Sequence, residues 1–362
     1  MHAGKLILTA AVVAAFPLTS CSHHHVQEVD PGTLLSVAKT YRQGPHATTV
    51  ATPDVENNEK DFKIDVEEML LDKDFDGLER VAQEARVKQT RLTGGPWKLY
   101  KFYEAISTPV AGEKATDDDW KTQLYALKQW ENAKATSATA HIATATAYEE
   151  YGAFARGTGY ANSVGDDAWE SLSERYAIAE HELLAAATMQ PEDPYWFYAV
   201  QVSSFNGSWN AGQSRGLFEQ AVAFEPAFYH YYREYAYYLL PKWFGEPGDA
   251  EALARDSMNR PGGDQGAFVY FEIASQLTCQ FDSRDTDMKN LSWPTIKAGY
   301  AALGRMYGVS PLKANRFARM AIEMDDKEAA QSAFAIVGDD WELMSWKSKS
   351  NFDRAKNWAE GQ

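Results

Sequence analysis

The chain has 362 residues, of which 45% are hydrophobic and 24% are charged, as is ordinary for a globular protein with a substantial core. Its formal net charge of -16 argues against nucleic acid as a partner, because an acidic surface repels a phosphate backbone. There are 2 cysteines, and one lies in the leader described next, so the sequence predicts no internal disulfide.

The first 21 residues have the features of a lipoprotein leader. Lys5 supplies a positive start, and Leu6–Pro17 is an apolar core too short to span a bilayer as a mature helix. Leu18–Cys21 then resembles a bacterial lipobox. The resemblance implies that residues 1–20 are a signal peptide and that acylated Cys21 (palmitate among its chains) anchors the protein in the lipid bilayer. An ordinary secretory leader with a chance cysteine is the alternative. Ser22, in place of Asp, favours an outer membrane location facing the periplasm if the host is Gram-negative.

Residues 21–60 are predicted to form a flexible, disordered tether. Prolines and glycines interrupt a mostly polar segment, although Leu34–Tyr41 could form one short amphipathic turn. A tether of this length would let the body move tens of ångströms from the membrane. His23, His24 and His25 could bind a metal, but no Cys or carboxylate pattern completes a site, which favours a polar spacer.

Residues 61–165 are predicted to form an N-terminal helical region, with helices that start near Phe62 and Phe75. Between these helices, the spacing of Asp72, Asp74 and Asp76 resembles the first half of a calcium loop. The second half of that pattern is missing, so we expect Asp74 or Asp76 to cap the second helix and predict no metal site. His141, in an alanine-rich segment, is predicted to be a packed or surface residue and not a ligand.

Three strings in this part of the chain and the next carry a family resemblance. They are RLTGGPWKLYKFYEAIS (residues 91–107), AFARGTGYANSV (residues 153–164) and LLPKWFGEPGD (residues 239–249). They resemble an uncharacterised bacterial family, domain of unknown function 4034, over roughly residues 65 to 280. The resemblance implies no activity, cofactor or catalytic residue.

Residues 166–362 contain the most regular pattern of the sequence. Pro191, Pro226 and Pro261 are 35 residues apart, and each ends a predicted helical run. The first two are preceded by small and apolar residues at matching spacings, namely Ala179, Leu183 and Ala186 before one and Ser214, Phe218 and Ala221 before the other. This period is typical of tetratricopeptide-type helix pairs. The sequence therefore predicts an all-α fold with a tetratricopeptide-like solenoid body and a polar C-terminal cap.

The predicted helix at residues 227–240 is the most aromatic of the chain. Aromatic residues on nearly all sides indicate either a central helix packed against both neighbours or a concave floor that binds a peptide or a sugar. The residues of this possible groove are Tyr198, Phe205, Tyr231, Tyr235, Tyr238, His230 and Arg233.

Two functions agree with these patterns. The first is a non-enzymatic lipoprotein that binds or scaffolds a protein partner in the cell envelope, and the acidic surface favours a basic or extended partner. The second is an envelope enzyme acting on peptidoglycan or glycans. The sequence contains no His-Glu-x-x-His helix, Gly-x-Ser-x-Gly elbow or Walker loop, and we identify no catalytic residue or cofactor. The first function is therefore favoured.

Overall fold

A computed structural model describes residues 26–41, 59–157, 164–207, 209–277 and 288–361. Within these ranges the regular elements are helices and there is no strand, which confirms the predicted all-α class. None of the helices in the described ranges is long and apolar enough to cross a membrane. The predicted leader, Cys21 and the three adjacent histidines lie outside the described residues.

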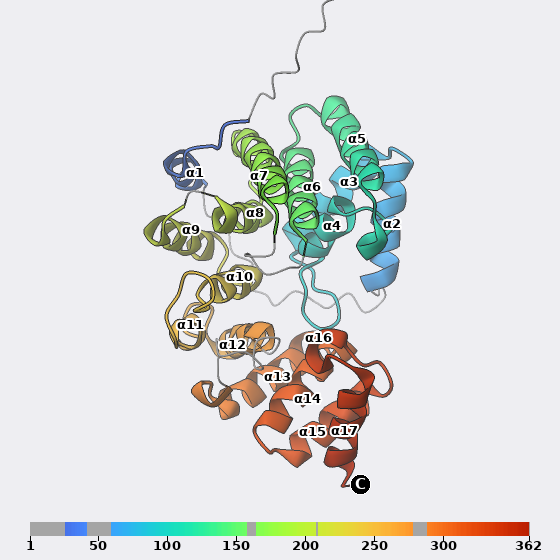
Figure 1. Cartoon of the computed structure of the whole chain (residues 1–362), viewed down its shortest axis with the longest axis vertical. Coiled ribbons are helices and arrows are strands. Elements are labelled where there is room, and N and C mark those ends of the chain that lie inside the picture. Colours follow the sequence, from blue (N-terminus) through green and yellow to red (C-terminus); the bar gives the residue numbers. More distant parts are fainter. Residues whose placement is uncertain (1–25, 42–58, 158–163, 208, 278–287, 362) are drawn as a thin grey trace, which may run out of the picture.

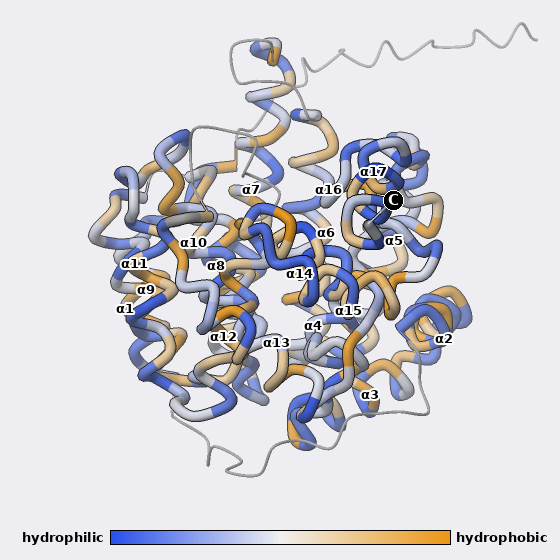
Figure 2. Tube along the Cα trace, turned by 90° about the horizontal axis from the view of Figure 1, so that it is seen from below, coloured by the Kyte–Doolittle hydropathy of each residue, from blue (hydrophilic) through white to orange (hydrophobic). Residues whose placement is uncertain are grey.

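The helices form two groups that meet at the middle of the molecule (Figure 1). The upper group is α1 (Pro31–Ala38), α2 (Glu59–Leu71), α3 (Phe75–Lys88), α4 (Lys98–Ser107), η1 (Gly112–Lys114), α5 (Asp117–Ala133), α6 (Ala138–Arg156), α7 (Asp166–Ala186), α8 (Pro194–Asn206) and α9 (Ala211–Phe224). The lower group follows α10 (His230–Tyr238) and α11 (Asp249–Ser257), and it comprises α12 (Gly263–Leu277), η4 (Met288–Asn290), α13 (Trp293–Tyr307), α14 (Pro311–Glu323), α15 (Lys327–Val337), α16 (Leu343–Trp346) and α17 (Lys349–Glu360). Most helices carry both hydrophobic and hydrophilic positions along their length (Figure 2), so each can bury one side.

Local sequence explains where many helices begin. The hydroxyls of Ser292 and Ser310 each accept a hydrogen bond from a backbone N–H three residues later, and a proline stands in the first turn of each helix, as predicted. Asp74 caps α3 by accepting a hydrogen bond of 2.9 Å from the N–H of Gly77. The aspartate run that resembles a calcium loop therefore begins a helix, as the sequence favoured.

The three regularly spaced prolines separate helix pairs. Pro191 lies between α7 and α8, Pro226 between α9 and α10, and Pro261 between α11 and α12. The helices that follow these prolines contact one another, α8 with α10 and α10 with α12, and each also contacts the helix that precedes it. α10 thus occupies a central position. It begins at His230, three residues after the predicted start of the aromatic helix.

The prediction of a flexible tether over residues 21–60 is wrong for residues 26–41, which pack against the body. The N–H of Val29 donates to Glu180 Oε2 at 3.1 Å, and the Tyr41 ring stacks on Trp196 with centroids 4.9 Å apart. Leu34 is fully buried where α1 meets α9. These contacts come from α7, α8 and α9, so a reading of the segment alone could not reveal them.

A tight turn before α4 reaches the lower group. Gly95 donates to the carbonyl of Leu92 at 2.9 Å and has a φ of 89°, a conformation that favours glycine. A Cβ added to Gly95 would lie 2.6 Å from Phe268 Cζ of α12. This close approach supplies a physical reason for the Gly-Gly-Pro string, which joins the upper group to the lower one.

Candidate functional site

A pocket of about 450 Å³, here called the central pocket, lies where α4, α10 and α14 come together. Its lining residues are Glu59, Thr93, Pro96, Tyr100, Lys101, Glu104, Tyr229, His230, Arg233, Ser310, Pro311, Leu312, Lys313, Arg316 and Asp340. The start of α14 faces this space, and the N-terminal end of a helix carries a partial positive charge. The pocket is therefore built from both helix groups.

The inner wall of the central pocket is cationic. Lys313 is only 4% exposed at its side chain, and its ammonium donates to Glu272 Oε2 at 2.5 Å. Arg233 lies 3.5 Å from the same oxygen, and Arg316 approaches from the next turn of α14. Glu272, on α12, is fully buried behind them. Two cationic side chains thus contact one buried carboxylate, and Arg316, which lies 3.7 Å from Glu342, adds a third positive charge to the wall.

Burial weakens the charge of one of these cations. It lowers the pKa of the Lys313 amine to about 7, because desolvation and the positive charges of Arg233 and Arg316 outweigh the attraction of Glu272. Protonation of Lys313 therefore responds to charge in the pocket near neutral pH. An anion placed there would favour the protonated form.

His230 is held between two tyrosines. Its ring stacks on Tyr100 with centroids 3.6 Å apart and on Tyr229 with centroids 4.1 Å apart. Burial, followed by the charges of Arg233 and Lys101, lowers the pKa of His230 well below its ordinary value. His230 is therefore a neutral imidazole at physiological pH, able to donate from one ring nitrogen.

Three nitrogen atoms of the pocket wall are buried without a hydrogen-bond partner among the described residues. They are Nε2 of His230, Nε of Arg233 and Nε of Arg316. Buried polar groups normally have partners, because an unmade hydrogen bond costs about 1–3 kcal/mol of desolvation. A ligand with two or three oxygen atoms could accept from these groups. Together with Lys313, these groups make the inner wall of the pocket rich in hydrogen-bond donors.

The mouth of the pocket is more balanced in charge. Lys101 lies 2.6 Å from Glu59 and 2.6 Å from Glu104, both of which are about half exposed. These acidic side chains flank the opening, while the cations lie deeper. A ligand with a positive or neutral body and an anionic end would match this order of charges.

The structure divides the groove predicted from the sequence. His230 and Arg233 line the central pocket, and the Tyr198 hydroxyl lies 3.4 Å from that of Tyr100 at its side. Tyr231 is fully buried and donates to the carbonyl of Pro194 at 2.6 Å, so its hydroxyl is already satisfied. Tyr235 is buried against Phe218. The seven residues therefore do not form one continuous floor.

Phe205 and Tyr238 belong to a second cavity, here called the aromatic pocket, of about 210 Å³. Trp243 and Phe244 also line it and are 42% and 53% exposed. Burial raises the pKa of Glu234, the acidic residue of the lining, to about 7. The aromatic pocket thus contains two of the seven predicted groove residues, and it is lined by α7, α8, the second half of α10 and the loop after α10.

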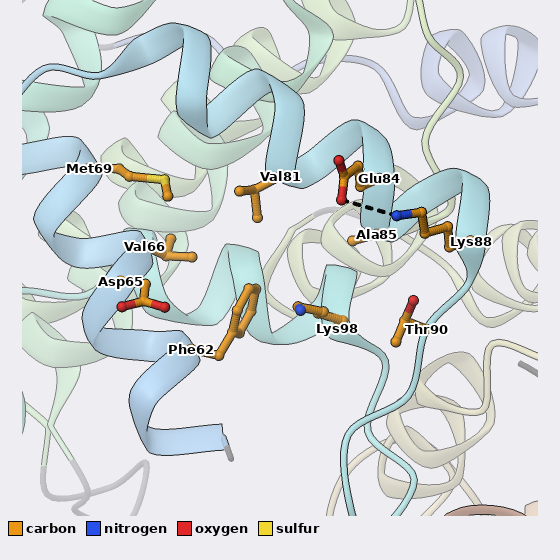
Figure 3. Close-up of a pocket in the computed structure, with 10 residues that line it drawn as sticks. All are labelled: Phe62, Asp65, Val66, Met69, Val81, Glu84, Ala85, Lys88, Thr90 and Lys98. Carbon is orange, nitrogen blue, oxygen red and sulfur yellow. Dashed lines mark hydrogen bonds and ion pairs between the residues drawn. The ribbon is translucent and has the colours of Figure 1, made fainter. Parts of the chain in front are cut away.

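A third cavity, of about 370 Å³, separates α2 from α3 (Figure 3). Phe62, Val66 and Met69 face it from α2, and Lys98 lies 4.7 Å from the Phe62 ring centroid. Glu84 and Lys88 pair with each other at 3.3 Å on the opposite helix. Its mainly apolar wall has no cluster of unpartnered polar atoms like that of the central pocket, so we do not treat it as the functional site.

Sequence reasoning missed Lys313, Arg316 and Glu272. A signal was present for two of them, because Glu272 interrupts the apolar run Phe268–Ala274 and Lys313 shares the helical period of Phe317 and Met320. A charged residue inside an apolar stripe is a candidate for a buried pair. Their mutual contact depends on helix packing and could not be read from spacing.

Comparison of the chain with protein-family models, with curated proteins and with solved structures gave no match. The candidate site therefore depends on the geometry alone.

Proposed function

We propose that this protein is a non-enzymatic binding lipoprotein of the cell envelope, whose central pocket takes the free C-terminal carboxylate of a protein partner. The observation that carries the proposal is the set of three unpartnered buried nitrogens beside Lys313. A carboxylate can accept from several N–H groups at once and is a good match for guanidinium donors.

The distribution of charge supports a peptide ligand with a basic or extended body. The chain as a whole is acidic, with a net charge of -16, and would attract a basic segment. Glu59 and Glu104 stand at the mouth, where the residues before a terminal carboxylate would lie. The outer surface would thus attract the body of the peptide, and the inner wall would bind its end.

The array of α7–α12 supports a tetratricopeptide-like body, since paired helices alternate between the regularly spaced prolines. The lipobox-like sequence supports anchoring through acylated Cys21. Four residues lie between Cys21 and Val26, so the Cα atoms of these two residues can be at most about 18 Å apart. Because residues 26–41 pack on the body, the anchored protein would remain close to the bilayer, with α1 on the membrane side.

The test is calorimetric titration with three probes: sulfate, a short lysine-containing peptide with a free C-terminus, and the same peptide amidated at its C-terminus. We expect the free acid to bind at least tenfold more tightly than the amide, because a hydrogen bond to a charged group contributes about 1.5–3 kcal/mol. Sulfate should compete with the free acid for the same site.

Lys313→Met and Arg233→Gln should each weaken binding of the free acid by about 10-fold or more. Arg305→Gln is the matched control, because Arg305 is exposed and pairs with Asp264 away from the pocket. Equal binding of acid and amide would refute capture of a terminal carboxylate. If both pocket variants bound the free acid as tightly as the parent, the central pocket would be refuted as the binding site.

A second candidate is an envelope enzyme acting on peptidoglycan or glycans. The observation that favours it is Glu234, a carboxyl group with a pKa of about 7 beside the exposed Trp243 in the aromatic pocket. A protonated carboxylic acid near an aromatic surface can act as a general acid on a glycosidic oxygen. Incubation of purified peptidoglycan with the parent protein and with Glu234→Gln separates the two candidates, since the enzyme candidate requires hydrolysis that the variant lacks.

A further inference from the structure

Three side chains able to ligate a metal ion meet where α5, α6 and α7 pack together, away from the pockets described above. They are Glu131 in the last turn of α5, His141 in the first turn of α6, and Glu182 in the second half of α7. One ligand atom from each lies within 4.8 Å of the other two. The sequence placed His141 alone on an alanine-rich face, and the fold brings two carboxylates to it.

One carboxylate oxygen of this cluster lacks a hydrogen-bond partner in the described part of the chain. Glu131 is only 3% exposed, and its Oε1 atom has no hydrogen-bond partner among the described residues. The second carboxylate, Glu182, accepts a hydrogen bond from His141 Nδ1 at 2.5 Å through its Oε2 atom. A buried carboxylate oxygen without a partner is costly, so a cation at this position would be favourable.

Lys128 supplies the positive charge of the cluster in the structure. Its ammonium pairs with Glu131 Oε2 and lies 3.6 Å from Glu182 Oε1. The Lys128 side chain is 56% exposed, so it can turn into solvent without leaving a cavity. The ammonium thus lies between the two carboxylates, where a metal ion would bind.

We propose that Glu131, His141 and Glu182 bind one divalent first-row transition-metal cation, which displaces Lys128. An imidazole nitrogen together with two carboxylate oxygens suits zinc, iron or manganese, whereas calcium and magnesium prefer oxygen ligands only. Zinc bonds of about 2.0–2.2 Å in a tetrahedral site place ligand atoms about 3.4 Å apart. The His141–Glu182 pair must therefore open by about 1 Å while Glu131 closes in, which side-chain rotation allows. The fourth position remains open to water or a ligand.

The test uses Zn²⁺ alone as the probe on the full mature chain without an added histidine tag. His23, His24 and His25 are replaced by Ser in every protein, because three adjacent imidazoles could bind zinc independently. Isothermal titration should show one saturable zinc site in this background. Thermal unfolding should shift upward with zinc, because a ligand that binds only the folded state stabilises it.

His141→Gln and Glu182→Gln should each weaken zinc binding by about 10-fold or more, whereas Lys128→Met should tighten it several-fold by removing the competing ammonium. His181→Gln is the matched control, because this neighbouring histidine is exposed and its Nε2 atom lies 2.9 Å from the Gln27 carbonyl oxygen, outside the cluster. Because the Lys128 side chain is exposed, zinc binding by Lys128→Met still tests the site if a cluster variant unfolds.

Absence of a saturable site in the parent background would overturn the proposal. Zinc affinity in folded His141→Gln equal to that of the parent would also overturn it, because binding would then occur elsewhere. An unchanged affinity in Lys128→Met would contradict the displacement step.

Discussion

Anion binding in the central pocket should depend on pH through Lys313. We would measure sulfate binding at pH 6 and at pH 8. Sulfate is chosen because its own charge does not change in this range. Burial lowers the pKa of Lys313 to about 7, whereas an anion beside the amine would raise it. Binding would then require uptake of a proton whenever the free amine is neutral.

The magnitude follows from the protonated fraction of the free protein. With a pKa of about 7, that fraction is about 91% at pH 6 and about 9% at pH 8. If sulfate binds the protonated form, its affinity should be about tenfold weaker at pH 8, which corresponds to about 1.4 kcal/mol. Because the pKa of Lys313 in the free protein is lowered to about 7, the affinity for sulfate falls as the pH rises through this value.

Neighbouring groups should not produce the same profile. His230 stays neutral because its pKa lies well below its ordinary value, and Tyr229 keeps its proton because burial raises its pKa. Burial lowers the pKa of Arg233 and Glu272 raises it, with a net increase, so Arg233 remains charged at both pH values. Lys313→Met should therefore bind sulfate weakly and equally at pH 6 and pH 8.

The assay is titration calorimetry at both pH values, repeated at pH 8 in buffers with different ionisation enthalpies. The parent should take up close to one proton per sulfate bound at pH 8, and Lys313→Met should take up none. A pH-independent affinity in the parent would refute the assignment of the low pKa. A tenfold pH effect that persists in Lys313→Met would show that another group titrates.

Three further predictions concern the fold and the anchor. Gly95→Ala should lower the free energy of urea unfolding by about 1–3 kcal/mol more than Gly112→Ala, because both have positive φ but only Gly95 meets an aromatic ring. Equal losses would contradict the close packing of the turn. Leu34→Ala should cost about 2–5 kcal/mol, and exposed Val26→Ala no more than about 0.5 kcal/mol; an unaffected Leu34→Ala protein would mean that α1 is not part of the body. Cys21→Ser should move the protein from the membrane fraction to the soluble fraction of lysed cells, and continued membrane association would exclude acylation as the anchor.

Much of the local structure could be predicted from the sequence. The all-α class, the capped starts of α13 and α14, and the helix boundaries at the three regular prolines follow from periodicity, capping residues and proline geometry. Each of these signals acts within a few residues, so it does not require knowledge of the rest of the chain. The cap of α3 at Asp74 also follows from the sequence, because an aspartate just before a helical run is a local signal.

The tertiary structure decided the candidate sites and the position of residues 26–41. Tyr100, His230, Glu272 and Lys313 lie on four helices, and their meeting depends on how α4, α10, α12 and α14 pack. The same holds for His141, whose carboxylate partners come from two neighbouring helices. Helical periodicity indicates which side of a helix is buried but not which other helix it meets, because that choice depends on side-chain packing between segments far apart in the chain.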